Sequence, residues 1–95
     1  MTASELEGRP VGGRRVLVVD DEPEFASLVC LWLERHGWDG IVATDGVKAL
    51  AAFTPQEPDI VLLDVGLPRM DGWQVLERIR AISRVPILLV TARGT

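Results

Sequence analysis

Short runs of consecutive aliphatic residues recur along the chain at residues 16–19, 60–63 and 87–90. Polar residues bound each run, a pattern typical of strands that are covered on both faces, as in a parallel sheet. Residues 40–43 form a weaker run of the same kind. The hydrophobic pattern therefore predicts four short strands.

Apolar residues at helical spacing fill the segments between these strands. The predicted helices cover residues 22–36, residues 46–53 ending before Pro55, and a segment that opens after Asp71 and Gly72 and ends near residue 83. Pro23 suits the first turn of the first helix and Gly37 suits its end. Its inward stripe is expected to be Phe25, Leu28, Val29 and Trp32, widened by Cys30 and Leu33.

This alternation of strands and helices predicts an α/β fold with a doubly wound parallel sheet. Residues 1–13, which hold three glycines and a proline, are expected to be a flexible leader to a domain at 14–95. The last predicted strand would have a bare aliphatic edge, which promotes association. We therefore expect a fold that lacks a final helix, strand and helix, or a second copy that covers the edge in a homodimer or swapped dimer.

Composition narrows the classes of protein to consider. A chain of 95 residues makes one domain, and its net charge of −4 argues against a nucleic-acid surface, which would be basic. No apolar run approaches the roughly 20 residues of a membrane span, so no membrane contact is expected. Cys30 is the single cysteine and cannot form an internal disulfide, which fits a cytoplasmic location.

Acidic residues follow two of the predicted strands. Asp20 and Asp21 come directly after the first strand and Asp64 after the third, while Thr91 follows the fourth. In an open parallel sheet, ligands gather beyond the carboxyl ends of the strands. Three carboxylates in one pocket repel one another, which favours a bound cation, and oxygen ligands suit Mg²⁺. The pattern therefore indicates a magnesium site for phosphoryl transfer, with Thr91 as a hydroxyl donor.

Three segments carry a resemblance to a known family. They are VLVVDDE at residues 16–22, DIVLLDVGLPRMDG at 59–72 and PILLVTAR at 86–93, with ATDGVKAL at 43–50 as further support. Over residues 14–95 the chain resembles the receiver domain of bacterial two-component response regulators, which implies a flavodoxin-like topology. The GLP and TAR triplets are similar to the branch that carries a C-terminal winged-helix DNA-binding domain.

The resemblance implies a role for each matching residue. Asp64 would accept a phosphoryl group from a sensor histidine kinase, and Asp20, Asp21, Asp64 and the Gly66 carbonyl would bind Mg²⁺. Thr91 would contact the phosphoryl group and switch the output. The chain would be a signalling module and not an enzyme, and DNA would be bound by a separate C-terminal domain of a longer parent, not by these residues.

Departures from the family pattern leave alternatives open. The pattern places a lysine at the end of a fifth strand, whereas the only lysine here is Lys48, in the second helix. The chain could then be a receiver that cannot be phosphorylated and serves only to bind a kinase. A magnesium-dependent phosphatase is a further alternative, although Gly66 stands where such enzymes place a second acid. Asp20 and Asp21 could also simply cap the first helix.

Overall fold

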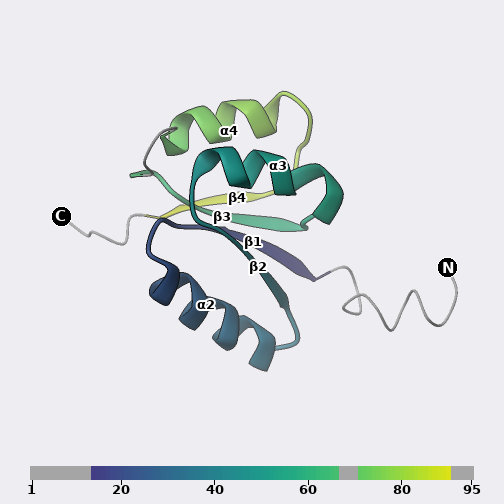
Figure 1. The fold of residues 1–95 in the computed structure, drawn as a ribbon. Helices are drawn as coiled ribbons and strands as arrows, with labels where there is room; N and C mark the ends of the chain where they lie inside the picture. Colours follow the sequence, from purple (N-terminus) through teal and green to yellow (C-terminus); the bar gives the residue numbers. More distant parts are fainter. Residues whose placement is uncertain (1–13, 67–70, 91–95) are drawn as a thin grey trace, which may run out of the picture.

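A computed structural model describes residues 14–66 and 71–90, in which strands and helices alternate (Figure 1). The elements are β1 (Arg15–Val19), α2 (Pro23–Arg35), β2 (Asp39–Ala43), α3 (Gly46–Gln56), β3 (Ile60–Asp64), α4 (Gly72–Arg80) and β4 (Ile87–Val90). Each predicted strand and helix is therefore present. The expected leader at residues 1–13 lies outside the described residues.

The four strands form one parallel sheet in the order β2-β1-β3-β4. Val18 stands beside Val42 on one side and Leu62 on the other, and Leu62 in turn stands beside Leu88. Helix α2 covers one face of the sheet, and α3 and α4 cover the other (Figure 1). The predicted doubly wound α/β fold is confirmed, and the carboxyl ends of all four strands meet at one edge.

The larger core lies between the sheet and the α3–α4 layer. Its strand residues alternate with residues that face α2, as the period of a strand requires. The fully buried members of this core are Leu17, Val19, Val61 and Leu63 from the strands and Ala49, Val75 and Ile79 from the helices. This well-packed layer fixes β1 and β3 relative to each other, and these two strands carry the acidic residues.

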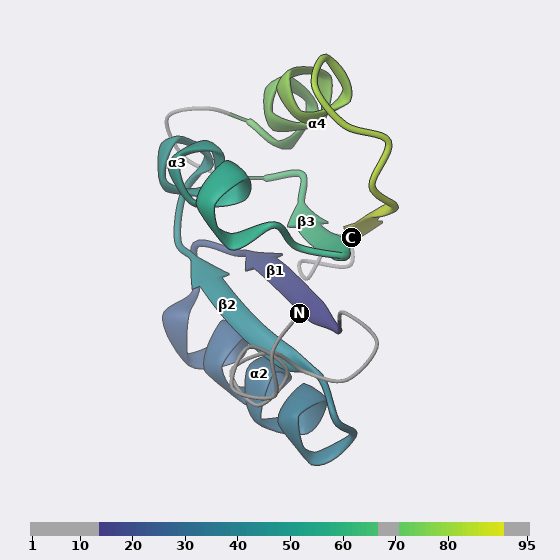
Figure 2. The ribbon, with the colours of Figure 1, turned by 90° about the vertical axis from the view of Figure 1, so that its right-hand side faces the viewer.

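The core on the α2 side is smaller, and it corrects the predicted stripe of that helix. Its buried members are Val16, Val18, Ala26, Cys30 and Leu33. Leu28 and Trp32 are instead 65% and 59% exposed. The reason is the position of α2, which lies against β2 and β1 (Figure 2). No described helix covers β3 and β4 on this face of the sheet. Residues expected to point inward thus border an open face.

Burial has a chemical consequence at Cys30. Removal from water raises the pKa of its thiol above the usual 9.0, and the nearby carboxylates of Glu34 and Asp39 raise it further. The thiol therefore stays protonated and packs as a small apolar side chain. Close packing is evident at Gly40 as well, because an added Cβ there would lie 2.6 Å from the Cys30 sulfur.

Helix α3 is longer than predicted. It continues through Pro55 to Gln56 instead of ending at Phe53. Proline removes one hydrogen bond from a helix, but the Glu57 N–H still donates to the Phe53 carbonyl at 3.1 Å and closes the last turn. Glu57 adopts a left-handed conformation, with φ of 48°, and ends the helix.

Among the described residues, no helix has the length and hydropathy that crossing a membrane requires.

Candidate functional site

Three aspartates meet at the carboxyl edge of the sheet. Asp20 follows β1 directly, and Asp64 is the last residue of β3; the strands are neighbours, with Val19 beside Leu63. Each of Asp20, Asp21 and Asp64 offers one carboxylate oxygen within 4.8 Å of the others. Asp20 is 2% exposed and Asp64 is 1% exposed, whereas Asp21 is half-buried. The sequence therefore predicted the members of this acidic cluster correctly.

Backbone groups hold Asp20 in place. Its N–H donates to the Ala43 carbonyl at 3.0 Å, which extends the pairing of β1 with β2 by one residue. Its Oδ1 accepts from the Glu22 N–H at 2.9 Å, a local turn that leads the chain into α2. Glu22 is the N-cap of α2 and makes no side-chain cap hydrogen bond. The Asp20 side chain thus shapes the turn before the helix and does not occupy the N-cap position.

Asp64 presents two different oxygens. Oδ1 accepts from the Gly66 N–H at 2.9 Å, which fixes the orientation of the carboxylate. Oδ2 is buried, and across residues 14–66 and 71–90 it has no hydrogen-bond partner. A buried polar atom without a partner costs free energy, and a charged one costs more. An oxygen kept in this condition beside two further carboxylates points to a bound cation or to chemistry at Oδ2.

The donor set fits Mg²⁺. All the side-chain donors are carboxylate oxygens, which hard divalent cations prefer, and three of them lie close enough to share one ion. The half-buried position of Asp21 leaves one side of the cluster reachable from solvent. Such a site leaves coordination positions for water and for a phosphoryl oxygen.

The loop after β3 is held by close backbone contacts. The Val65 N–H donates to the Val90 carbonyl at 3.2 Å, and the Gly72 N–H donates to the Val65 carbonyl at 3.3 Å. An added Cβ at Gly72 would lie 2.5 Å from the Val65 Cα and 2.8 Å from the Asp64 carbonyl oxygen. Glycine is therefore required where α4 begins, because the helix packs directly on the backbone that carries Asp64.

Gly72 was missed as a site residue by the sequence reasoning. Asp71 and Gly72 suggested only the start of a helix, and the structure does show a capping box between Asp71 and Gln74. A single sequence carries no signal that distinguishes a glycine in a turn from one that allows close packing. Of the other predicted site residues, Gly66 is joined to Asp64 by the hydrogen bond from its N–H, and Thr91 lies outside the described residues.

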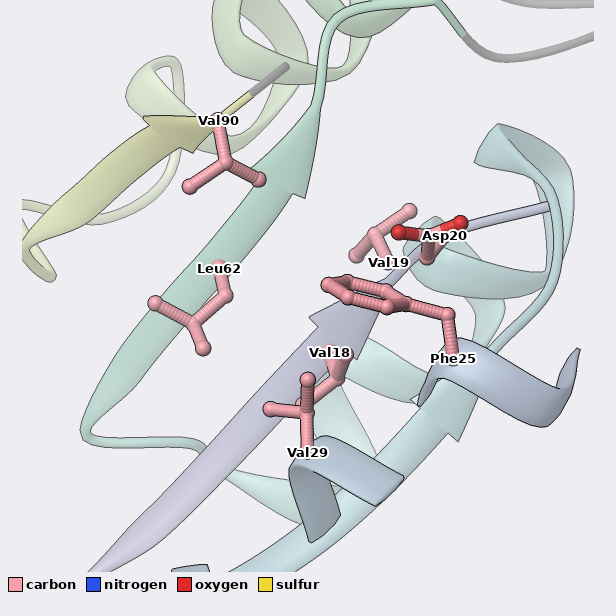
Figure 3. Close-up of a pocket in the computed structure, with 7 residues that line it drawn as sticks. All are labelled: Val18, Val19, Asp20, Phe25, Val29, Leu62 and Val90. Atoms are coloured by element: carbon pink, nitrogen blue, oxygen red, sulfur yellow. The ribbon is translucent and has the colours of Figure 1, made fainter. Parts of the chain in front are cut away.

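An apolar pocket adjoins the acidic cluster (Figure 3). Phe25 and Val29 from α2 face Val18, Leu62 and Val90 of the sheet, and Asp20 lies at one end with Val19. Its walls offer almost no hydrogen-bonding groups, so it suits an apolar side chain better than a phosphate. The pocket lies on the part of the sheet face that α2 leaves uncovered, and it shares Asp20 with the acidic cluster.

Comparisons with known proteins bear on this arrangement. The family model described as the response regulator receiver domain matches residues 16–95. Transcriptional regulatory protein TrcR of Mycobacterium tuberculosis is 44% identical over 90 residues, which cover 94% of this chain and 34% of that protein. The chain therefore spans about a third of the length of this relative.

Solved structures show the same fold. The N-terminal domain of a response regulator receiver protein from Methanoculleus marisnigri matches with a TM-score of 0.78 and 41% identity, over 82% of this chain and 66% of that one. A chain in the crystal structure of histidine kinase ThkA in complex with response regulator protein TrrA matches with a TM-score of 0.78 and 35% identity, over 86% and 72%.

Proposed function

Because this chain belongs to the family of response regulator receiver domains, we propose that it accepts a phosphoryl group on Asp64 from a sensor histidine kinase. The observation that carries the proposal is the buried Asp64 Oδ2, which has no partner among the described residues. Asp64 also belongs to a cluster of three carboxylates. Proteins with the fold of this chain include one in a kinase–regulator complex, which supports a histidine kinase as the phosphoryl donor.

The reacting atom is Oδ2 of Asp64. Because the Gly66 N–H holds Oδ1, Oδ2 keeps its lone pairs for the attack on phosphorus. A bond forms between Oδ2 and the phosphorus of a phosphohistidine, and the phosphorus–nitrogen bond breaks. The imidazole nitrogen keeps the electron pair and takes a proton from solvent, and Asp64 becomes an acyl phosphate. Fixed orientation of the nucleophile lowers the entropic cost of the transfer.

Asp20, Asp21, Asp64 and the Gly66 backbone carbonyl would hold Mg²⁺. When bound, the ion supplies positive charge that offsets the carboxylates and the phosphoryl oxygens. The role of the protein is to bring these oxygens together before the reaction, through the turn at Asp20 and the loop after β3. Thr91 would then contact the phosphoryl group and pass the change to the rest of the molecule.

The regulatory output that follows phosphorylation is assigned to a part of the parent protein outside these residues. The relatives that this chain matches include a transcriptional regulatory protein about three times as long as the matched region. We assign transcription regulation to a longer parent, with DNA bound by a separate domain and signalling in the cytoplasm. No nucleic-acid contact is assigned to the residues present here.

The test is phosphorylation of the purified chain by acetyl phosphate and Mg²⁺, followed by intact-mass spectrometry. Wild type should gain one phosphoryl group, and Asp64→Asn should gain none. Glu77→Gln, which removes an exposed carboxylate from α4, is the matched control and should be phosphorylated like wild type. A folded wild-type chain that gains no phosphoryl group would leave only the alternative function, a module that binds a kinase without accepting phosphate.

A further inference from the structure

The peptide bond between Asp64 and Val65 is held at both ends. Its N–H donates to the Val90 carbonyl at 3.2 Å, which continues the pairing of β3 with β4 past Asp64. At its carbonyl end lies Gly72, where an added Cβ would be 2.8 Å from the Asp64 carbonyl oxygen and 2.5 Å from the Val65 Cα. The Gly72 N–H also donates to the Val65 carbonyl at 3.3 Å. These contacts of Val90 and Gly72 with the peptide bond form what we call the clamp.

The side chain of Asp64 is held as well. Its Oδ1 accepts from the Gly66 N–H at 2.9 Å, and the residue is buried, so the carboxylate cannot turn without breaking this hydrogen bond. The peptide nitrogen of Val65 and the carboxylate carbon of Asp64, Cγ, are therefore each fixed by contacts with other residues. Two neighbouring groups that are fixed in this way cannot rearrange freely relative to each other.

An aspartate that carries a phosphoryl group is open to a side reaction with its own chain. The acyl phosphate makes Cγ electrophilic, and the nitrogen of the following peptide bond can attack it. A bond then forms between the Val65 nitrogen and the Asp64 Cγ, and the bond from Cγ to the phosphoryl oxygen breaks. Phosphate leaves with the electron pair, and the N–H proton passes to solvent. The product is a succinimide ring, in which the phosphoryl group is lost and the acceptor carboxylate is destroyed.

The clamp opposes this reaction. A peptide nitrogen shares its lone pair with the neighbouring carbonyl, so the peptide plane must rotate before the nitrogen can attack Cγ in a productive orientation. Rotation would break the hydrogen bond to Val90 and move the Asp64 carbonyl oxygen, which is packed on Gly72. The nitrogen must also lose its proton, and the Val90 carbonyl that accepts the hydrogen bond is too weak a base to take it.

We infer that the clamp protects the acyl phosphate on Asp64 from cyclisation onto the Val65 nitrogen. The inference rests on the proposed function, because only an activated Asp64 needs this protection. It gives the close contact at Gly72 a chemical role besides packing, since a glycine there lets α4 reach the peptide bond that must not rotate. Val90 and Gly72 are positioning residues in this account and do not touch the phosphoryl group.

The first test replaces Asp64 by Asn, because a side-chain amide cyclises by the same attack without phosphorylation. Combining Asp64→Asn with Val65→Gly removes the shielding by the branched side chain, so the rate reports the clamp. Deamidation at position 64, followed by peptide mass spectrometry, should be slower in the folded chain than in urea by about tenfold or more, the factor that one lost hydrogen bond represents. Adding Gly72→Ala should raise the folded rate severalfold, because the methyl group displaces the peptide bond. Adding Glu77→Ala, at an exposed position of α4, is the matched control and should leave the rate unchanged.

Phosphorylated wild type provides the second readout. After treatment with acetyl phosphate and Mg²⁺, the folded chain should lose its phosphoryl group by hydrolysis and return to the mass of the unmodified chain. A product lighter than the unmodified chain by one water is the succinimide, and its formation in the folded chain would overturn the inference while leaving the proposed function intact. Equal deamidation rates in the folded chain and in urea, or a folded rate that Gly72→Ala leaves unchanged, would also overturn the inference alone. A chain that gains no phosphoryl group would overturn the proposed function and the inference with it.

Discussion

At the scale of a single residue, the two carboxylate oxygens of Asp64 lie in different environments. Its Oδ1 accepts a hydrogen bond from the Gly66 N–H, while its buried Oδ2 has no partner within the described residues. The arrangement costs stability in the absence of a cation and prepares an oxygen for reaction. Asp20 is equally buried but serves differently, because its carboxylate also forms the turn into α2.

Replacing Asp64 by Asn should stabilise the protein in metal-free buffer. The change removes one buried negative charge and gives the cluster an amide donor, and the free energy of unfolding should rise by about 1–2 kcal/mol. Thermal unfolding with and without Mg²⁺ measures the effect. Wild type should be stabilised by Mg²⁺, and Asp64→Asn much less so. Equal stabilisation of both proteins would show that Asp64 does not contribute to the cation site.

The element that positions Asp64 is the start of α4. Gly72 packs directly on the backbone of Val65, and the capping box of Asp71 and Gln74 fixes where the helix begins. Helix α4 then buries Val75 and Ile79 against the sheet. The orientation of Asp64 therefore depends on a contact made by a helix that carries none of the acidic cluster.

Replacing Gly72 by Ala should disturb this contact. The added methyl group would lie 2.5 Å from the Val65 Cα, so the loop or the helix must shift. We expect a loss of about 1–3 kcal/mol in the free energy of unfolding by urea, together with slower phosphorylation by acetyl phosphate. Glu77→Ala, on the exposed side of the same helix, is the control. If both variants behave like wild type, Gly72 has no positioning role.

The success of sequence reasoning differs between elements for physical reasons. The strands were predictable because each is a short run of consecutive aliphatic residues, with β1 buried on both faces. The acidic cluster followed from the topology of a parallel sheet. The predicted stripe of α2 was right at Cys30 and Leu33 and wrong at Leu28 and Trp32, because hydrophobic spacing does not reveal which strands a helix covers. The end of α3 was also wrong, since Pro55 in a last turn costs only one hydrogen bond. The contact at Gly72 depends on three-dimensional proximity alone.

At the scale of the whole molecule, the acidic cluster and the aliphatic strand β4 lie on neighbouring strands of the sheet. The acidic cluster lies at the carboxyl ends of β1 and β3, and the aliphatic edge is β4, the next strand of the sheet. Val90 adjoins both, because it stands beside Asp64 and its carbonyl accepts from the loop after β3. One backbone hydrogen bond, from the Val65 N–H to the Val90 carbonyl, thus joins the loop after Asp64 to the edge strand.

The central claim is that the phosphoryl group resides on Asp64, and its position can be determined chemically. Wild type is treated with acetyl phosphate and Mg²⁺, reduced with borohydride, which converts a phosphorylated aspartate into homoserine, and then digested for peptide mass spectrometry. The account predicts homoserine at position 64 and unmodified aspartate at Asp20 and Asp21. Homoserine at either of those residues, with Asp64 unchanged, would contradict it.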